Sequence, residues 1–91
     1  MIKVWNERAW DEYLYWQQQD KKTLNKINRL IKDIERNGYE CIGKPEPLKH
    51  NLSGWWSVEI DEKNRLVFRL SESNSYKTIE LLACKGHYQD A

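Results

Sequence analysis

The chain alternates apolar and polar side chains in two neighbouring segments, Trp56-Ser57-Val58-Glu59-Ile60 and Arg65-Leu66-Val67-Phe68-Arg69-Leu70. Apolar residues at every second position are typical of β-strands that bury one face. Because only a few polar residues separate the two segments, the pattern predicts an antiparallel hairpin. We therefore expect this hairpin to form part of a β-sheet that the other predicted strands extend.

The hydrophobic pattern also predicts the register of this hairpin. If both apolar sets face the core, Ile60 pairs with Leu66. In the same register Val58 pairs with Phe68, which leaves a three-residue loop that ends at Asn64. Such loops end in a left-handed residue, a conformation that asparagine tolerates well. The second face of the hairpin then carries charged side chains, namely Glu59, Asp61, Arg65 and Arg69.

Two amphipathic helices are predicted before the hairpin. Asn6 is a candidate N-cap for a helix over residues 7–18, and Asp20 is a candidate N-cap for the next helix. Gly38 is placed to end that second helix. Its apolar stripe consists of Leu24, Ile27, Leu30, Ile31 and Ile34. We interpret the basic side chains opposite this stripe as a solvated face, with an RNA-binding surface as the alternative.

The two ends of the chain supply further strands. Ile2-Lys3-Val4-Trp5 alternates as a short first strand, residues 71–75 form a polar turn, and residues 76–85 form the last strand. This order predicts a single α+β domain over residues 1–91, in which two helices cover one face of a three-strand antiparallel meander. The length of 91 residues and the hydrophobic content of 40% suit one globular domain. We expect the uncovered face to be functional.

Composition limits the classes of function. The net charge is +1, but residues 21–54 carry eight basic and four acidic side chains, which permits nucleic-acid binding without requiring it. Cys41 and Cys84 lack C-x-x-C spacing, which favours two inert thiols over a disulfide or a metal site. The sequence has no long apolar run and no signal-peptide pattern, so we expect a cytoplasmic protein without a membrane partner.

The segment Gly43-Lys44-Pro45-Glu46-Pro47-Leu48-Lys49-His50 contains both prolines of the chain. Because proline biases the preceding residue toward extended geometry, Lys44 and Glu46 are expected to be extended. The loop then presents one carboxylate among Lys44, Lys49 and His50. This arrangement suits a catalytic base near an anionic substrate, although a rigid connector with solvated charges is the simpler interpretation of this stretch alone.

Glu46, Arg65 and His87 can meet on the uncovered face of the sheet. Cleavage of RNA without a metal needs a base for the 2′-hydroxyl proton, an acid for the departing 5′-oxygen and cations for the phosphate charge. Glutamate, histidine and arginine fill these roles, and Tyr88 or Trp55 could stack on an unpaired base. The sequence shows no glycine-rich phosphate loop, zinc-ligand cluster or nucleophilic triad, so we expect no metal or cofactor.

Motifs along nearly the whole chain fit one known family. They are Trp10-Asp11-Glu12-Tyr13-Leu14-Tyr15-Trp16, Lys26-Ile27-Asn28, Leu30-Ile31-Lys32-Asp33, the loop over residues 43–54, Trp56-Ser57, Arg65-Leu66-Val67 and His87-Tyr88. Together they resemble the YoeB/Txe toxins of the RelE/ParE toxin–antitoxin superfamily. The Lys-Pro-Glu-Pro-Leu-Lys-His block is the most specific of them.

The resemblance implies a microbial-RNase-like α+β fold and a ribosome-dependent endoribonuclease that cleaves mRNA in the decoding site and arrests translation. It implies a YefM-type antitoxin as partner, with operator DNA bound only through the toxin–antitoxin complex, and it is compatible with a homodimer. By position it assigns the general base to Glu46, the phosphate-stabilising arginine to Arg65, the general acid to His87 and a near-terminal tyrosine to Tyr88. The expected RNA contacts are Lys44, Lys49, His50 and Arg69.

Two features depart from the family pattern. Val58-Glu59 stands where the family usually has two arginines, so an anion lies near Arg65. Residues 89–91 continue past the His-Tyr pair at which the family commonly ends. Glu59 predicts weaker RNA binding or turnover unless Arg69 or Lys85 compensates. The tail removes the terminal carboxylate from Tyr88 and adds Asp90 nearby. A domain that binds antitoxin and RNA or the ribosome without cleaving is therefore the alternative, whereas inhibition of DNA gyrase gives no reason for the base–acid pair.

Overall fold

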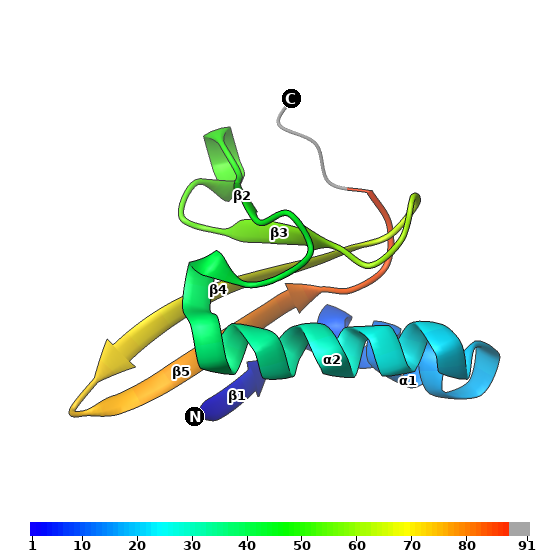
Figure 1. Ribbon diagram of the computed structural model, residues 1–91, viewed down its shortest axis with the longest axis horizontal. Helices are drawn as coiled ribbons and strands as arrows, with labels where there is room; N and C mark the ends of the chain where they lie inside the picture. The colour runs from blue at the N-terminus through cyan, green and yellow to red at the C-terminus, as the bar shows by residue number, and fades with distance from the viewer. Residues whose placement is uncertain (88–91) are drawn as a thin grey trace.

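The computed structural model describes residues 1–87 of the chain. Within this range two helices lie on one face of a five-stranded sheet with the strand order β1-β5-β4-β3-β2 (Figure 1). The helices are α1 (Glu7–Gln19) and α2 (Lys21–Asn37), and short 3₁₀ turns follow at Gly38–Glu40 and His50–Leu52. The strands are β1 (Ile2–Trp5), β2 (Glu46–Pro47), β3 (Trp56–Glu59), β4 (Arg65–Ser73) and β5 (Tyr76–Ala83). The predicted α+β arrangement is confirmed.

Both helices begin at the predicted caps. Asn6 Oδ1 accepts a hydrogen bond from the backbone N–H of Ala9 at 2.8 Å. Asp20 Oδ1 accepts one from the backbone N–H of Lys22 at 3.1 Å. Gly38 follows α2 with a φ of +60°, a conformation that glycine adopts without steric cost. Side chains and backbone therefore satisfy the helix ends where the sequence indicated.

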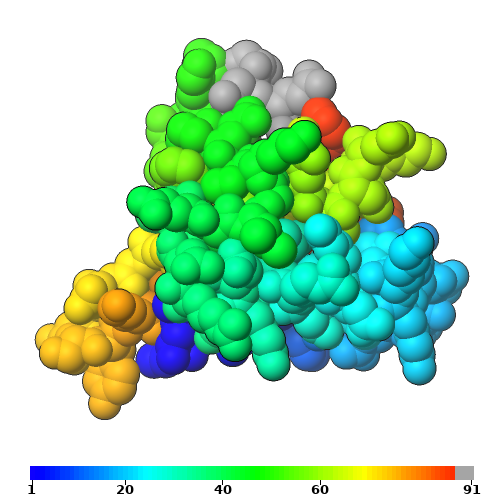
Figure 2. All heavy atoms as spheres, in the orientation of Figure 1, coloured from blue at the N-terminus to red at the C-terminus, as the bar shows by residue number. Residues whose placement is uncertain are grey.

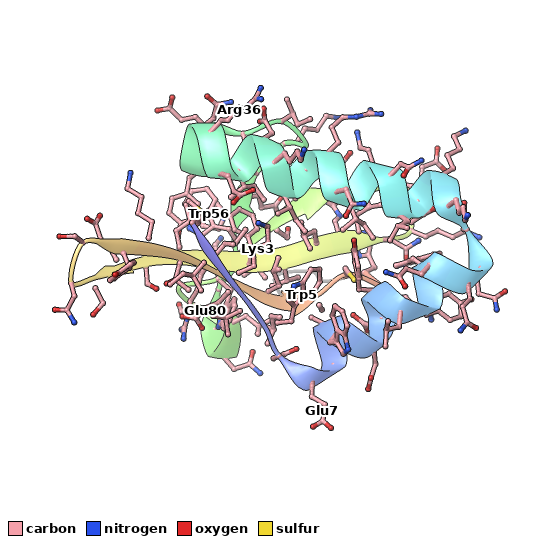
Figure 3. All side chains as sticks on the ribbon, turned by 90° about the horizontal axis from the view of Figure 1, so that it is seen from below. Lys3, Trp5, Glu7, Arg36, Trp56 and Glu80 are labelled. Atoms are coloured by element: carbon pink, nitrogen blue, oxygen red, sulfur yellow. The ribbon has the colours of Figure 1, made fainter. Side chains whose placement is uncertain are left out.

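The sheet is mixed because β1 pairs in parallel with β5, with Ile2 opposite Thr78. β1 is an edge strand, and Ile2 and Val4 are 49% and 46% exposed. Trp5 faces the helix layer instead, where its ring centroid lies 4.6 Å from that of Tyr13 in α1 (Figure 3). One face of β1 therefore packs on the helices while the other stays in solvent.

The meander of β3, β4 and β5 is confirmed, with changes at two strand ends. β4 continues to Ser73, beyond the expected start of the turn, because a tight turn at residues 74–75 lets Ser73 pair with Tyr76. β5 ends at Ala83, earlier than predicted, because the backbone of Cys84 bonds to side chains of α1. The final segment thus leaves the sheet before it reaches the predicted site.

The predicted register between β3 and β4 is wrong by two residues. Val58 pairs with Leu66 rather than with Phe68. A shift of two residues keeps every side chain on its predicted face, so the core set was still correct. Glu59 lies directly opposite Arg65 on the other face, which confirms that these two charges are neighbours.

Asp61 explains the longer turn between β3 and β4. Its Oδ1 accepts hydrogen bonds from the backbone N–H groups of Lys63 and Asn64, both at 2.8 Å. The Asn64 side-chain amide donates to both Asp61 carboxylate oxygens at 3.2 and 3.1 Å. Asp61 therefore belongs to the turn and not to the predicted charged face, and Asn64 does not adopt the predicted positive φ.

The environment of Asp61 favours its ionised form. Partial burial has the largest single influence and raises the pKa of this carboxyl group. The hydrogen bonds from Asn64 and from the backbone of Lys63 act in the opposite direction, and together they hold the pKa below its usual value. The turn is consequently closed by a carboxylate at neutral pH.

Buried side chains form a core on each face of the sheet, and the core on the helix side is the larger one. The main cluster fills the space between helices and sheet and includes Ile27, Leu30, Ile34, Val58, Leu66, Phe68, Ile79 and Leu81. A second, small cluster on the opposite face buries Leu48, Val67 and Ala83, with Leu52, Trp55 and Leu82 around them. The loop after β2 therefore covers part of the face that was expected to be free.

Cys41 and Cys84 are both buried, free thiols, as predicted. Burial raises the pKa of each thiol, and for Cys84 burial and the nearby charge of Glu12 raise it to about 12.

Among residues 1–87, no helix is both long and apolar enough to cross a membrane.

Gly43→Ala is expected to destabilise the fold more than Gly54→Ala. Both glycines have positive φ, +94° and +93°, so both substitutions carry the same backbone strain. At Gly43 the added Cβ would also lie 3.0 Å from both Leu30 Cδ2 and Val58 Cβ, whereas nothing lies within 4 Å at Gly54. Urea denaturation should show an additional loss of about 1–3 kcal/mol for Gly43→Ala. Equal losses would show that the loop moves to relieve the contact.

The Cys84 thiol is expected to resist alkylation in the native state. With its pKa at about 12, against an ordinary value of 9.0, its thiolate fraction at pH 8 falls by about a thousandfold. Mass spectrometry after iodoacetamide treatment should show labelling of Cys84 only in denaturant. Because the folded pKa is raised, the associated stability is present below pH 9 and is lost as the pH rises toward 12. Equal labelling of native and denatured protein would contradict this.

Candidate active site

Glu46 lies in β2, the two-residue strand that the loop adds to the edge of the sheet. It stands opposite Ser57 of β3, and Pro47 stands opposite Trp56. Pro47 has no N–H to donate, which an edge strand tolerates. The predicted extended geometry of Glu46 is confirmed, and its side chain is exposed. The loop is therefore part of the sheet, and the sheet determines where Glu46 lies.

The predicted RNA contacts of the loop, Lys44, Lys49 and His50, are exposed on either side of β2. Lys44 has a φ of +54°, so its predicted extended geometry is wrong. The carbonyl oxygen of the preceding Gly43 accepts a hydrogen bond from the backbone N–H of Glu59 at 2.8 Å, which bends the chain toward β3 here. His50, with a φ of +57°, begins the 3₁₀ turn that leaves the sheet again.

Glu46 and Arg65 lie on the same face of the sheet, the face opposite the helices. Glu46 is opposite Ser57, and Ser57 is opposite Val67. Arg65 is two residues from Val67 along β4, and side chains two residues apart share a face. Two strand spacings and two residues along a strand separate the Cα atoms of Glu46 and Arg65 by about 12 Å. Both side chains are long enough to reach one phosphodiester group between them.

Arg65 is mostly buried and faces Glu59. Its side chain is 17% exposed, and its Nη2 atom lies 3.6 Å from Glu59 Oε1. Its Nε atom is buried and has no hydrogen-bond partner among residues 1–87. A buried N–H without a partner is costly, so this guanidinium has capacity for a further oxygen ligand. A phosphate could bind the part of the guanidinium that is exposed, whereas Nε becomes accessible to it only if the Arg65 side chain moves.

His87 is exposed and begins next to the backbone of Arg65. The peptide of Gly86 connects the two, because Arg65 N donates to Gly86 O at 2.9 Å. The chain end before residue 88 and the loop that carries β2 lie on the side of the molecule away from the helices (Figures 1 and 2). Tyr88, the remaining predicted catalytic residue, lies outside the described residues.

Arg69, a predicted RNA contact, is already engaged by two neighbours. Its Nη2 atom lies 2.9 Å from Glu80 Oε2. Its guanidinium carbon lies 4.4 Å from the centroid of the Trp55 ring, a cation–π contact. A nucleobase that stacks on Trp55, as the sequence suggested, would have to share the Trp55 ring with Arg69 or displace Arg69 from it.

Sequence reasoning missed three residues whose side chains bind the segment before His87, namely Glu12, Trp16 and Asn64. Their types are common on protein surfaces, and their partners lie far away in the chain, so no local pattern identified them.

Within residues 1–87, no group of three or more His, Cys, Asp or Glu side chains is arranged to hold a metal ion.

Comparison with known proteins gives a consistent result over nearly the whole chain. A family model described as "YoeB-like toxin of bacterial type II toxin-antitoxin system" matches residues 5–88. The chain is 51% identical over 88 residues to Toxin YoeB of Escherichia coli strain K12, and this alignment covers 97% of the chain and 100% of that protein.

Solved structures agree with the sequence match. A YoeB/ParE toxin from Agrobacterium tumefaciens is similar with a TM-score of 0.91 and 40% identity, over 97% of this chain and 100% of that one. YoeB from Staphylococcus aureus, solved as a dimer and in a YoeB–YefM complex, gives a TM-score of 0.84 in both cases. Its identity is 43% and 42%, over 97% of this chain and 98% of each of those chains. The similarity extends over the fold as a whole rather than over one motif.

Proposed function

The chain belongs to the YoeB-like toxins of bacterial type II toxin–antitoxin systems, and from this premise we propose that it is an endoribonuclease that cleaves mRNA on the ribosome. The observation that supports the proposal most is the shared sheet face of Glu46 and Arg65, next to the peptide that leads to His87. A base, a cation and an acid can therefore act on one phosphodiester.

In the proposed reaction Glu46 takes the proton from a 2′-hydroxyl group, and the 2′-oxygen attacks the adjacent phosphorus. The bond from phosphorus to the 5′-oxygen breaks, and His87 donates a proton to that oxygen. The products are a 2′,3′-cyclic phosphate and a 5′-hydroxyl group. Arg65 stabilises the charge that grows on the phosphate, and its position on the same sheet face as Glu46 supports this role. Such acid–base chemistry contributes about 10²–10⁴-fold for each proton transfer.

The RNA contacts are proposed to surround this centre. Lys44, Lys49 and His50 are exposed beside Glu46, and cations there attract the phosphate backbone. Arg69 would meet RNA together with Trp55, because the two side chains are stacked. Tyr88 is proposed as a further catalytic contact, next to His87 in sequence.

The partners proposed for this chain follow from its relatives. YoeB of Staphylococcus aureus forms a complex with YefM and has also been solved as a dimer. We infer that a YefM-type antitoxin binds this chain, that the chain can form a homodimer, and that operator DNA is bound only through the antitoxin complex. Ribosomes and mRNA as targets imply action in the cytoplasm.

A second candidate function is supported by the contact between Arg65 and Glu59. Because Glu59 already neutralises part of the Arg65 charge, catalysis could be weakened until the domain mainly binds antitoxin and RNA or the ribosome. The two functions differ in one measurable property, which is cleavage of mRNA by the wild-type chain.

Glu46→Gln and His87→Gln are each expected to reduce mRNA cleavage by at least about 100-fold, because each removes one proton-transfer group. Primer extension on mRNA in a translating extract measures the effect. Glu62→Gln is the matched control, since it makes the same change at an exposed turn position and should cleave like the wild type. Equal cleavage by all variants would contradict the assigned roles.

Glu59→Gln is expected to raise kcat/KM by about 1.4–5-fold, because a partly exposed ion pair is worth about 0.2–1 kcal/mol. Glu59→Arg should raise it further and make binding more sensitive to salt, since it adds a phosphate contact. Glu72→Gln, at the far end of β4, is the control for net charge. Unchanged cleavage by both Glu59 variants would show that Glu59 does not compete for Arg65. Absence of cleavage in every variant would favour the binding function.

A further inference from the structure

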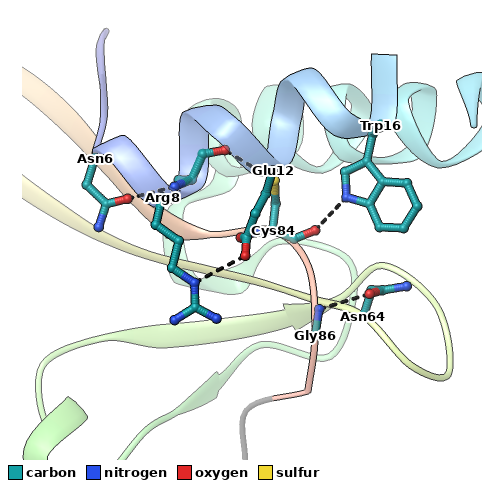
Figure 4. Close-up of polar contacts among 8 residues, drawn as sticks. Asn6, Arg8, Glu12, Trp16, Asn64, Cys84 and Gly86 are labelled. Atoms are coloured by element: carbon teal, nitrogen blue, oxygen red, sulfur yellow. Dashed lines mark hydrogen bonds and ion pairs between the residues drawn. The ribbon is translucent and has the colours of Figure 1, made fainter. Parts of the chain in front are cut away.

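The chain that leaves β5 is first held by α1. The backbone N–H of Cys84 donates to Glu12 Oε1 at 2.7 Å, and the carbonyl oxygen of Cys84 accepts from Trp16 Nε1 at 2.8 Å (Figure 4). The second oxygen of Glu12 lies 3.1 Å from Arg8 Nε, and the Glu12 side chain is only 15% exposed. Both the backbone N–H and the backbone C=O of Cys84 are therefore bound by side chains of α1.

The same segment is held a second time by the β3–β4 turn. The backbone N–H of Gly86 donates to Asn64 Oδ1 at 2.9 Å (Figure 4). Gly86 O accepts from Arg65 N at 2.9 Å. Asp61 receives the amide N–H groups of Asn64 on both of its carboxylate oxygens. Because Nδ2 of Asn64 faces Asp61, the other end of the amide, Oδ1, is directed toward Gly86.

These two anchors determine where the next residue begins. Cys84 and Gly86 are fixed on both of their polar groups, and the side chain of Lys85 between them lies over the Tyr15 ring, with 4.9 Å from Nζ to the centroid. Only the torsions of His87 itself remain to be set. The residue that binds Gly86 O is Arg65, so the same turn holds the guanidinium and the start of the histidine.

We propose that Asn64 and Glu12 are positioning residues that hold His87 beside Arg65 for transfer of its proton to the 5′-oxygen. The inference rests on the proposed endoribonuclease function. Neither residue touches the substrate in this scheme, since each acts on the backbone of the segment that carries the acid. Misplacement of a catalytic group by about 1 Å can cost about 100-fold in rate, so release of either anchor should reduce proton transfer.

A substrate whose leaving group needs no proton distinguishes a residue that positions the acid from one that only stabilises the fold. An mRNA with a sulfur in place of the 5′-bridging oxygen at the cleavage position releases a thiolate, which leaves without a proton. We expect Asn64→Ala to cleave ordinary mRNA on programmed ribosomes about 10–100-fold more slowly than the wild type. On the sulfur substrate it should cleave within about threefold of the wild type. Glu12→Ala should behave in the same way.

Two controls make the comparison decisive. Asn25→Ala removes the same side chain from an exposed position of α2 and should match the wild type on both substrates. His87→Gln is the reference for loss of the acid and should be slow only on ordinary mRNA. Circular dichroism checks that each variant is folded, and Glu12→Ala carries the test if Asn64→Ala is not.

The outcomes distinguish this inference from the function on which it rests. Equal slowing of Asn64→Ala on both substrates would assign Asn64 to general stability or RNA binding and overturn the inference. Wild-type rates on both substrates would overturn it as well. If His87→Gln itself shows no preference for the sulfur substrate, the acid role of His87 in the proposed function is wrong. If His87→Gln shows it and both anchor variants do not, only the positioning role is wrong.

Discussion

The carboxylate of Asp61 closes the turn between β3 and β4, and the geometry of the proposed site depends on that turn. By accepting two backbone N–H groups, Asp61 sets the length of the turn and thereby the register of the two strands. This register places Glu59 opposite Arg65 and turns the amide of Asn64 toward Gly86. A slip of one residue would move Arg65 to the core face, because side chains alternate between faces.

The electrostatics of the site centre on Arg65, which one carboxylate already contacts. Glu59 belongs to the same strand pair and is therefore always present, whereas an RNA phosphate must arrive from solution. The contact is long and Glu59 is partly exposed, so the competition is worth less than a charge-assisted bond to a phosphate dianion-like transition state. Glu59 would thus lower the rate of RNA cleavage rather than abolish it.

Local signals in the sequence were sufficient for the helices and for the faces of the strands. Asn6, Asp20 and Gly38 act on backbone groups a few residues away, so their types and positions predict helix ends directly. The register was not predictable from alternation, because a shift of two residues leaves every face unchanged. β2 was missed because two prolines argue against a strand, although an edge position needs few donors. The anchors of Cys84 join the first helix to the last strand, and no local pattern reports such a contact.

The two edges of the sheet differ in their capacity to accept another strand. β2 is two residues long and contains Pro47, so it offers very little backbone for a further ladder. β1 is longer, lacks proline, and exposes Ile2 and Val4 on one face. An added strand would therefore extend the sheet at the β1 edge, which lies two strands away from Arg65 because only β5 separates β1 from β4. Assembly through backbone pairing at that edge would leave the Glu46 edge open to a nucleic acid.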